Sequence, residues 1–375
     1  MTYPEQYENV PNLRARFRGC LLGGAVGDAL GGPVEFLSLS EIITRYGAPG
    51  VKDYEHAWGG KGKITDDTQM TLFTAEGLLR AWTRASVRGI GPAFTSVTAH
   101  AYLRWLLTQG ERNRHDLLDT ASLSGWLIRH EALFHPRAPG ATCLTALREM
   151  RAFGEPARNH SKGCGGVMRV GPVGLFYVRY PEQDGLQAAF DTGCQLAALT
   201  HGHPTGYLTG GVLAALIFQL VKDVPLETAL DGAVALLVRA PGHDETRRVL
   251  ERARELAGSP RSAEEPVSAL GEGWVAEEAL AIAVYCALRA RSFEEGVLMA
   301  VNHSGDSDST GAIAGNLLGA MYGLTAIPEH WQTRLELNAV IQEMADDLLA
   351  YRDWQISDYD DTPTARALRE KYPGD

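Results

Sequence analysis

The chain has 375 residues, 45% of which are hydrophobic, and a formal net charge of −11 at pH 7. This length allows one large domain or two ordinary ones, and the hydrophobic content is enough for a sizeable core. The negative charge argues against nonspecific binding to nucleic acid or to an anionic membrane surface. It does not exclude a phosphorylated substrate, because a bound metal ion can supply local positive charge.

The cysteines and the N-terminus bear on where the protein works. The first residues lack the apolar segment of a signal peptide, and no uncharged run is long enough to span a membrane. The cysteines are odd in number and form no C-x-x-C pair, a pattern typical of a reducing compartment: Cys20, Cys143, Cys164, Cys194 and Cys286. We therefore expect a cytoplasmic protein with no membrane segment.

The first expected helix, Arg16–Gly32, carries a glycine at every fourth residue, at Gly19, Gly23, Gly27 and Gly31. Such residues share one helix face. Each glycine costs about 1 kcal/mol relative to alanine, so the spacing predicts another backbone packed closely on that face. Asp28 interrupts the apolar residues and excludes a lipid-facing helix. Pro33 ends or bends the helix, and Glu35 follows in the exit loop, where a carboxylate judged alone is expected to be exposed.

A second helix is expected after the loop Tyr46–Gly62, and it opens with an acidic pair. Thr65 is well placed as N-cap, with Asp66 and Asp67 in the first turn, where the helix dipole favours negative charge. The apolar pattern then runs to about Arg84. Helix capping explains one of these acids comfortably and both adequately.

The remaining patterns are helical, and no segment alternates with period two or resembles a flexible linker. We expect helices at Pro92–Gln109, Ser122–Phe134, Ala141–Arg151, Leu186–Leu199, within the charged stretch Arg239–Pro266, and at Gly273–Arg291, Trp331–Trp354 and Thr364–Tyr372. The sequence therefore predicts an all-α fold in a single domain. Its divisions are an N-terminal extension at 1–14, the domain at 15–354 and a polar C-terminal tail at 355–375.

Two segments in the middle of the chain have the composition of binding loops. Ser161–Arg169 is rich in glycine, so its backbone N–H groups are open to a ligand. It matches neither the Walker A nor the dinucleotide pattern, and a plain flexible turn explains it equally well. His201 and His203 flank Gly202, which begins a second glycine series with Gly206 and Gly210.

The densest cluster of oxygen-bearing side chains lies in Val301–Gly323, where Asp306, Ser307, Asp308, Ser309 and Thr310 precede a third series, at Gly311, Gly315, Gly319 and Gly323. A helix cap uses fewer oxygens than this, so the cluster is a candidate site for a hard divalent cation. An EF-hand is excluded because its twelfth position is Leu317. A DxDxT phosphotransfer motif would follow a buried strand, whereas Phe293–His303 reads as a helix end and a turn.

The two acidic helix starts are complementary. Neither pair alone supplies enough oxygen ligands for one or two hard cations. We therefore predict that Asp66 and Asp67 converge with Asp306 and Asp308 on one site, although some 240 residues separate the pairs.

With these motifs in place, the chain resembles the ADP-ribosylglycohydrolase family over roughly residues 15–350. Five segments in order carry the resemblance: GCLLGGAVGDALGGPVEF, ITDDTQM, SKGCGGVMRVGPVGL, THGHPTGYLTGG and NHSGDSDSTGAIAG. It implies a single compact, orthogonal multi-helix domain. It also implies a central cleft that holds two Mg²⁺ ions, or Mn²⁺, and receives ADP-ribose.

The resemblance also implies roles for individual residues. The metal ligands would be Thr65, Asp66, Asp67, Asp306, Asp308 and Ser309, with Thr310 as an alternative to Ser309. The diphosphate and distal ribose would lie on Ser161, Gly163, Cys164, Gly165 and Gly166, with His201 near the ligand. The general acid or base would be Glu35, or a metal-bound aspartate such as Asp67 or Asp306.

The function implied is hydrolysis of the glycosidic bond at C1″ of a ribose attached to a protein side chain. The substrate would be an ADP-ribosylated protein and the product ADP-ribose. We expect an arginine linkage, because a protonated guanidinium departs with little acid assistance whereas a serine alkoxide must be protonated. Alternatives are another ADP-ribosyl linkage (serine, a nucleic-acid base or a small molecule), a non-catalytic ADP-ribose-binding homologue, and a metal-dependent hydrolase of a different nucleotide or phosphorylated small molecule.

Overall fold

The computed structural model describes residues 12–118, 123–180, 184–259, 267–357 and 359–374. Throughout these residues the regular structure is helical, and the only β-type pairings are the isolated bridges Ala57–Gly60 and Gly163–Val275. The all-α prediction is confirmed. No single described helix is long and apolar enough to cross a membrane; one bent pair, Leu13–Val34 with Leu39–Tyr46 at 90°, passes by length and composition alone.

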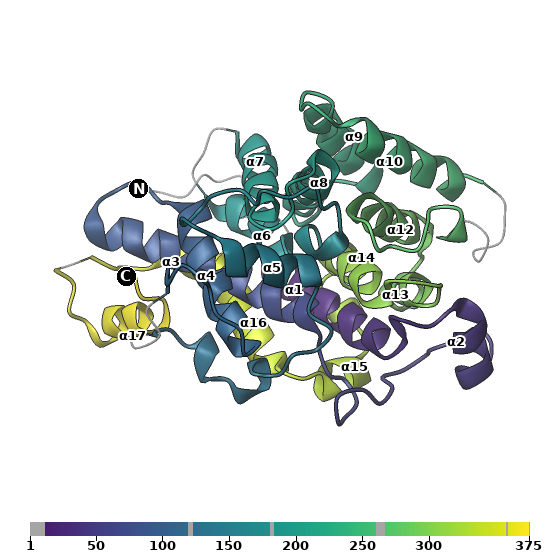
Figure 1. Cartoon of the computed structure of the whole chain (residues 1–375), viewed down its shortest axis with the longest axis horizontal. Coiled ribbons are helices and arrows are strands. Elements are labelled where there is room, and N and C mark those ends of the chain that lie inside the picture. The colour runs from purple at the N-terminus through teal and green to yellow at the C-terminus, as the bar shows by residue number, and fades with distance from the viewer. Residues whose placement is uncertain (1–11, 119–122, 181–183, 260–266, 358, 375) are drawn as a thin grey trace.

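Helices α1 (Leu13–Gly31) and α14 (Ser307–Tyr322) form the centre of the fold (Figure 1). Their glycine series face each other in antiparallel order, with Gly19 opposite Gly319, Gly23 opposite Gly315 and Gly27 opposite Gly311. A Cβ atom added to any of these glycines would lie closer than 3.0 Å to the other helix's backbone. The predicted backbone contact is confirmed, and it brings the start of α14 against the end of α1.

Helix α3 (Asp66–Arg88) is tied to α1 by a buried carboxylate. Asp28 accepts hydrogen bonds from the Thr65 N–H at 3.0 Å and the Thr68 N–H at 3.1 Å, and from the Thr68 hydroxyl. These are orphan donors of the first turn of α3, which helix geometry leaves unpaired. Asp28 therefore fixes the acidic start of α3 beside the end of α1.

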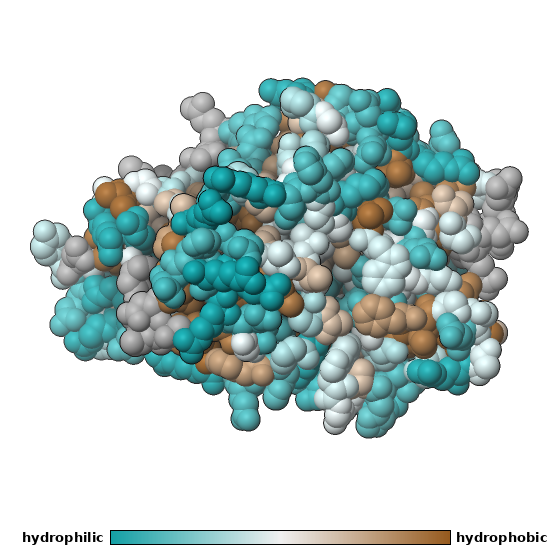
Figure 2. All heavy atoms as spheres, viewed as in Figure 1, coloured by the Kyte–Doolittle hydropathy of each residue, from teal (hydrophilic) through white to brown (hydrophobic). Residues whose placement is uncertain are grey.

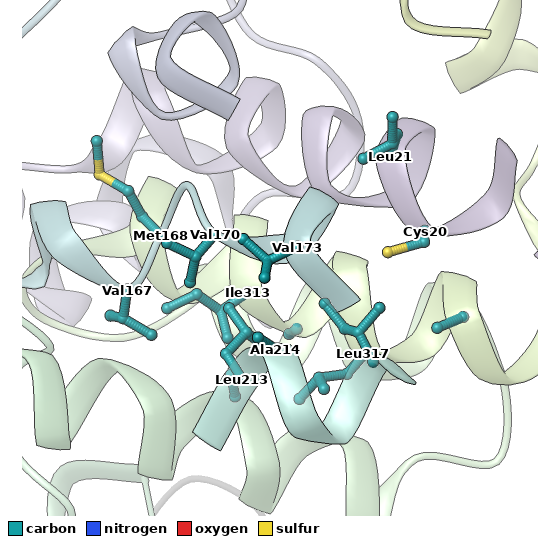
Figure 3. Packing of buried hydrophobic residues seen from close by; sticks show 14 of the residues in the cluster. Cys20, Leu21, Val167, Met168, Val170, Val173, Leu213, Ala214, Ile313 and Leu317 are labelled. Atoms are coloured by element: carbon teal, nitrogen blue, oxygen red, sulfur yellow. The ribbon is translucent and has the colours of Figure 1, made fainter. Parts of the chain in front are cut away.

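The glycine-rich loop rests on α7 (Gly185–Ala198) and α8 (Pro204–Leu220). The second glycine series lets this happen, because Gly202 lies against the Asn159 carbonyl and Gly206 against the Ser161 carbonyl. Gly210 packs on the Gly193 carbonyl of α7. The loop enters α6 (Gly171–Arg179) through a buried apolar group that includes Val167, Val170, Val173, Leu213 and Ile313 (Figure 3).

The other elements surround this centre (Figure 1). They are η2 (Gly32–Val34), α2 (Leu39–Tyr46), α4 (Phe94–Thr108), η4 (Leu127–Arg129), η5 (Glu131–Leu133), α5 (Ala141–Glu149), η6 (Cys164–Gly166), α6 (Gly171–Arg179), α9 (Leu226–Leu237), α10 (Asp244–Ala257), α12 (Ala276–Arg289), α13 (Phe293–Val301), η7 (Leu324–Ala326), α15 (Glu329–Arg334), α16 (Asn338–Ala350), η8 (Tyr351–Asp353) and α17 (Pro363–Lys371). The face in Figure 2 is mainly hydrophilic, with hydrophobic residues in scattered groups.

Two expected helices are wrong. The stretch 122–134 holds only the short turns η4 and η5 among its described residues. Its backbone instead accepts a hydrogen bond from α3, because the buried Arg80 donates to the Ser124 carbonyl at 3.0 Å. The next residue, Gly125, has a left-handed conformation with φ +102°. Non-helical conformation at that glycine is compatible with its lack of a side chain.

The second wrong helix is Trp331–Trp354, which the structure divides into α15 and α16. Leu337 between them is left-handed, with φ 57°. Glu336 explains the break: its N–H donates to the Gly62 carbonyl at 2.9 Å, and its carboxylate pairs with Lys63 at 2.8 Å and with Arg137. These contacts with distant residues override the local helical pattern.

Candidate metal centre

Six carboxylates are buried together where α1, α3 and α14 meet. Each has at most 7% of its surface exposed: Asp28, Glu35, Asp66, Asp67, Asp306 and Asp308. Asp306 is the N-cap of α14 and accepts from the Ser309 N–H at 3.2 Å. Thr65 is the N-cap of α3, as predicted, and accepts from the Asp67 N–H at 3.2 Å. The two caps place the acidic pairs at adjoining helix starts.

Glu35 is not exposed, so the expectation made for this residue alone is wrong. Pro33 lies in the short 3-10 helix η2, which follows α1 directly. This turn directs Glu35 toward α14. Carboxylate oxygens of Glu35, Asp306 and Asp308 lie within 4.8 Å of one another. The loop after α1 thus adds a third acidic group to the two helix starts.

The predicted convergence of the two aspartate pairs is present. Asp67 is close enough to Asp308 for its charge to act on that carboxylate, and Asp306 acts on Asp66 as well as on Asp67. Asp66 also accepts a hydrogen bond from the Gly140 N–H at 3.3 Å. The carboxylates therefore form one electrostatic cluster.

The cluster carries an uncompensated negative charge. Burial, followed by the neighbouring carboxylates, raises the pKa values of Asp66, Asp67 and Asp308 well above their usual range. The same causes raise the pKa of Glu35 to about 9, and burial raises that of Asp28 to about 6. Within the described residues, no lysine or arginine forms an ion pair with any of the six.

The residues present fit a hard divalent cation. Glu35 Oε2 and Asp67 Oδ1 are buried and have no hydrogen-bond partner among the described residues. Buried polar atoms are normally satisfied, so these two oxygens indicate a missing ligand. The donors around them are carboxylate and hydroxyl oxygens, which Mg²⁺ and Mn²⁺ prefer.

Of the two hydroxyls that follow Asp308, only Ser309 is free to face the cluster. Thr310 Oγ1 is engaged with the end of α13 and the turn that follows it, where it donates to the Ala300 carbonyl at 2.7 Å and contacts His303 Nε2 at 2.8 Å. Ser309 instead lies beside Asp67. This geometry favours Ser309 over Thr310 as a ligand.

The glycine-rich loop is fixed beside the acidic cluster and is not a free turn. Two backbone hydrogen bonds hold it to the start of α12, from the Cys164 N–H to the Trp274 carbonyl at 3.2 Å and from the Ala276 N–H to the Lys162 carbonyl at 2.8 Å. Buried Arg169 donates to the Gly165 carbonyl at 2.8 Å. The Cys164 Sγ donates to Asp306 Oδ2 at 2.7 Å.

The His201 ring packs against the buried side of this loop and supports it. It is buried, contacts the Thr200 hydroxyl through Nδ1 at 2.8 Å, and packs under Gly163, Gly165 and Gly166. Burial and the nearby Arg169 lower the pKa of His201 to about 3, so the ring is neutral at pH 7. His203 has a separate task as N-cap of α8, where it accepts from the Thr205 N–H at 3.2 Å.

Sequence reasoning missed three residues that shape the site. Asp28 fixes the start of α3, and its signal was an isolated acid in an apolar helix. Arg169 fixes the loop and had no comparable signal. Phe36, 71% exposed, stacks on Trp274 with ring centroids 5.7 Å apart beside Glu35.

Comparisons with known proteins give consistent results. Residues 9–357 match the family model described as ADP-ribosylglycohydrolase. The chain is 26% identical to the ADP-ribosyl-[dinitrogen reductase] glycohydrolase of Rhodospirillum rubrum, over 91% of this chain and 97% of that protein. It is 28% identical to mouse ADP-ribosylhydrolase ARH3, over 86% of this chain and 88% of that protein.

A third relative and a solved structure complete the comparison. The chain is 24% identical to the ADP-ribosylarginine hydrolase Tri1 of Pseudomonas putida, over 89% of this chain and 77% of that protein. It superposes on the structure of an ADP-ribosylglycohydrolase-related protein complex with a TM-score of 0.64 and 31% identity, covering 91% of this chain and 98% of that one. The likeness therefore extends over nearly the whole fold.

Proposed function

The chain belongs to the ADP-ribosylglycohydrolase family, and we propose that it removes ADP-ribose from modified arginine side chains by metal-dependent hydrolysis. One observation carries the proposal. A cluster of buried, unpaired carboxylates with two unsatisfied oxygens adjoins a fixed glycine-rich loop. A structural role alone does not require such a cluster, because buried like charges oppose folding.

We assign the residues three roles: metal binding, binding of the diphosphate and ribose, and proton transfer. Two Mg²⁺ or Mn²⁺ ions would be held by Thr65, Asp66, Asp67, Asp306, Asp308 and Ser309. When bound, such ions supply Lewis acidity and orient ribose hydroxyls. The Ser161–Gly166 backbone would receive the diphosphate and distal ribose through exposed N–H groups, with neutral His201 keeping the loop in place.

Glu35 is the group to which we assign proton transfer. Burial and the neighbouring carboxylates raise its pKa, and its Oε2 has no hydrogen-bond partner among the described residues. In the reaction, the bond between C1″ and the arginine nitrogen breaks and its electron pair stays on the nitrogen, which takes a proton from Glu35, while a water oxygen adds to C1″. Asp67 or Asp306 would accept the proton of that water.

Support for arginine comes from the leaving group and from one relative. A guanidinium needs little protonation as it departs, which suits a site where, outside the proposed ligands, the described carboxyl group with an unpartnered oxygen is Glu35. The similar Tri1 protein is named as an ADP-ribosylarginine hydrolase.

A second candidate is a serine linkage. It is favoured by the buried Glu35, because a carboxyl group that retains its proton can protonate a departing alkoxide.

The test compares ADP-ribose release from arginine- and serine-linked ADP-ribosyl peptides at equal concentration. Reactions contain Mg²⁺ or EDTA, and Glu35→Gln is assayed in parallel. Faster Mg²⁺-dependent release from arginine supports the proposal. Faster release from serine, with strong dependence on Glu35, would select the second candidate, and no release from either peptide would reject both.

A further inference from the structure

Phe36 and Trp274 are large aromatic side chains on the surface beside the acidic cluster. Phe36 is 71% exposed and Trp274 is 38% exposed. Their rings are nonetheless stacked, with centroids 5.7 Å apart and an angle of 19° between the planes. Single apolar side chains on a surface are ordinary, but a stacked pair from two distant segments is a specific contact. It is made by the residue that directly follows Glu35.

The backbone around Trp274 is the fixed side of this contact. The Glu278 carboxylate accepts a hydrogen bond from the Glu272 N–H at 3.0 Å. The Glu272 carbonyl in turn accepts from the Asp306 N–H at 2.8 Å. The Trp274 carbonyl accepts from the Cys164 N–H at 3.2 Å. The segment that carries Trp274 is therefore bonded both to the N-cap of α14 and to the glycine-rich loop.

Phe36 belongs to the short turn that carries Glu35. Val34 is fully buried, and the Leu37 N–H donates to the Val34 carbonyl at 2.9 Å, so the turn at 34–37 is closed by its own hydrogen bond. Within this turn the Glu35 carboxyl group points into the cluster, while the Phe36 ring lies outside on Trp274. A contact that holds the Phe36 ring therefore also sets the position of Glu35.

Glu35 needs such a support, because its own surroundings secure it only in part. A carboxylate oxygen of Glu35 lies within 4.8 Å of oxygens of Asp306 and Asp308, and such groups repel one another when they are ionised. Its Oε2 has no hydrogen-bond partner among the described residues. The aromatic stack supplies a hold that does not depend on the charges in the cluster.

We propose that Trp274 is a positioning residue for Glu35: stacked on Phe36, its indole keeps the turn at 34–37 against the acidic cluster. The inference deepens the proposed function, because it rests on Glu35 as the group that transfers the proton. An aromatic pair of this kind shifts a conformational equilibrium by about 2- to 10-fold. Loss of the stack therefore lets the turn leave the cluster more often by that factor.

The first test measures the turn directly and needs no substrate. Amide hydrogen exchange of the full chain is followed by mass spectrometry in peptides that cover residues 34–38, for wild type and Trp274→Ala. The Leu37 N–H is bonded within the turn, so its exchange reports how often the turn opens. Because the substitution lies outside these peptides, their intrinsic exchange rates are unchanged. Exchange should accelerate about 2- to 10-fold in the variant.

The second test is kinetic and uses an arginine-linked ADP-ribosyl peptide in saturating Mg²⁺. Trp274→Ala and Phe36→Ala should each lower kcat by up to about 10-fold, with KM within about twofold of wild type. Because both act through one contact, the double variant should be no slower than the slower single variant. Trp274→Phe retains a ring and should recover most of the wild-type kcat and exchange, which separates the stack from general destabilisation.

Tyr322→Ala is the matched control. Tyr322 is 40% exposed, close to the value for Trp274, but it ends α14, whereas Asp308 lies in the first turn of that helix. This variant should keep wild-type exchange at residues 34–38 and wild-type kcat.

The outcomes separate this inference from the proposed function. Unchanged exchange in Trp274→Ala overturns the inference, and so does faster exchange with unchanged kcat. Additive losses in the double variant, or weaker ADP-ribose binding by calorimetry in the single variants, would show that the rings act separately or touch the ligand, and would also overturn it. Faster exchange in Trp274→Ala, with no hydrolysis by wild type, rejects only the proposed function.

Discussion

At the scale of single residues, the acidic side chains contribute charge to the interior and little packing. Asp308 is 2% exposed and faces Asp67, Glu35 and Asp306 without a basic partner. Burial of a charge is costly unless it is paired. These side chains therefore oppose folding of the metal-free protein while they prepare the site to bind a cation.

Replacement of Asp308 by asparagine should separate stability from activity. We expect Asp308→Asn to abolish Mg²⁺-dependent turnover, because a ligand is lost. In EDTA the same variant should be more stable than wild type, by on the order of 1 kcal/mol, because one repelling charge is removed. Peptide hydrolysis and urea denaturation in EDTA measure the two effects.

Asp346→Asn is the control for this change. Asp346 lies on α16, where it pairs with Arg14 at 2.6 Å and Arg18 at 2.5 Å. Because it has basic partners, its loss should lower stability slightly, by under about 1 kcal/mol, with no effect on turnover. A metal-free Asp308→Asn protein that is less stable than wild type would contradict our account of the cluster.

His201 should give the fold a pH dependence of its own. Its pKa is lowered to about 3 in the folded protein, against about 6.5 in an unfolded chain. The contribution of His201 to the free energy of unfolding is therefore present above pH 6.5. It is lost as pH falls toward 3, since in this range only the unfolded chain takes up the proton. Between about pH 7.5 and about pH 5 this amounts to about 2 kcal/mol of lost stability.

The measurement is urea denaturation at several pH values for wild type and His201→Gln. The wild-type free energy of unfolding should fall more steeply below pH 6.5 than that of the variant. Parallel curves for the two proteins would show that His201 is not held neutral. Comparison of the two slopes removes the contribution of the other titrating groups, which both proteins share.

At the scale of elements, the glycine series determine how closely α1 and α14 approach. The four-residue spacing was visible in the sequence, and so was its need for a facing backbone. Which helix faces which was not visible, because three series were present and any pairing satisfied the local pattern. The structure pairs the first series with the last and gives the second to the glycine-rich loop.

The α1–α14 contact can be tested with Gly315→Ala. A Cβ at this position would meet the Gly23 carbonyl of α1, and backbone cannot move aside as a flexible side chain can. We expect destabilisation of about 1–3 kcal/mol or more, measured by urea denaturation. Gly91→Ala is the matched control, because a Cβ there meets nothing within 4 Å. A control-like result at Gly315 would mean that the two helices are not in backbone contact.

The break within the expected helix Trp331–Trp354 could not be predicted from the local sequence. Its local pattern is helical on both sides of the break, and helices do form there. The break depends on Glu336 meeting Lys63 and Arg137, which lie 273 and 199 residues away in the chain. No local signal announces such a contact. Glu35 is the same kind of case, since its burial depends on η2 turning it toward α14.

At the scale of the whole molecule, the fold brings segments that are distant in the sequence together at the acidic cluster. The N-terminal helix α1, the early helix α3 and the late helix α14 supply the carboxylates, and Ser161–Gly166 from the middle closes the site (Figure 1). The motifs predicted these participants. Their convergence follows from the α1–α14 contact and from Asp28, which fixes α3 to α1. The site therefore forms only when the whole domain folds.

Because the site and the domain form together, a bound divalent cation should stabilise the entire protein. An ion that binds only the folded state adds about 2.7 kcal/mol when its concentration is 100 times its Kd. The carboxylates lie far apart in the chain, so the unfolded protein has no comparable site. We expect EDTA to lower the melting temperature of wild type and Mg²⁺ or Mn²⁺ to restore it. NaCl at equal ionic strength should not do so, because buried charges are poorly screened. Asp308→Asn should respond much less to the divalent ion. Equal restoration by NaCl, or an undiminished response in Asp308→Asn, would mean that the cation acts elsewhere on the molecule.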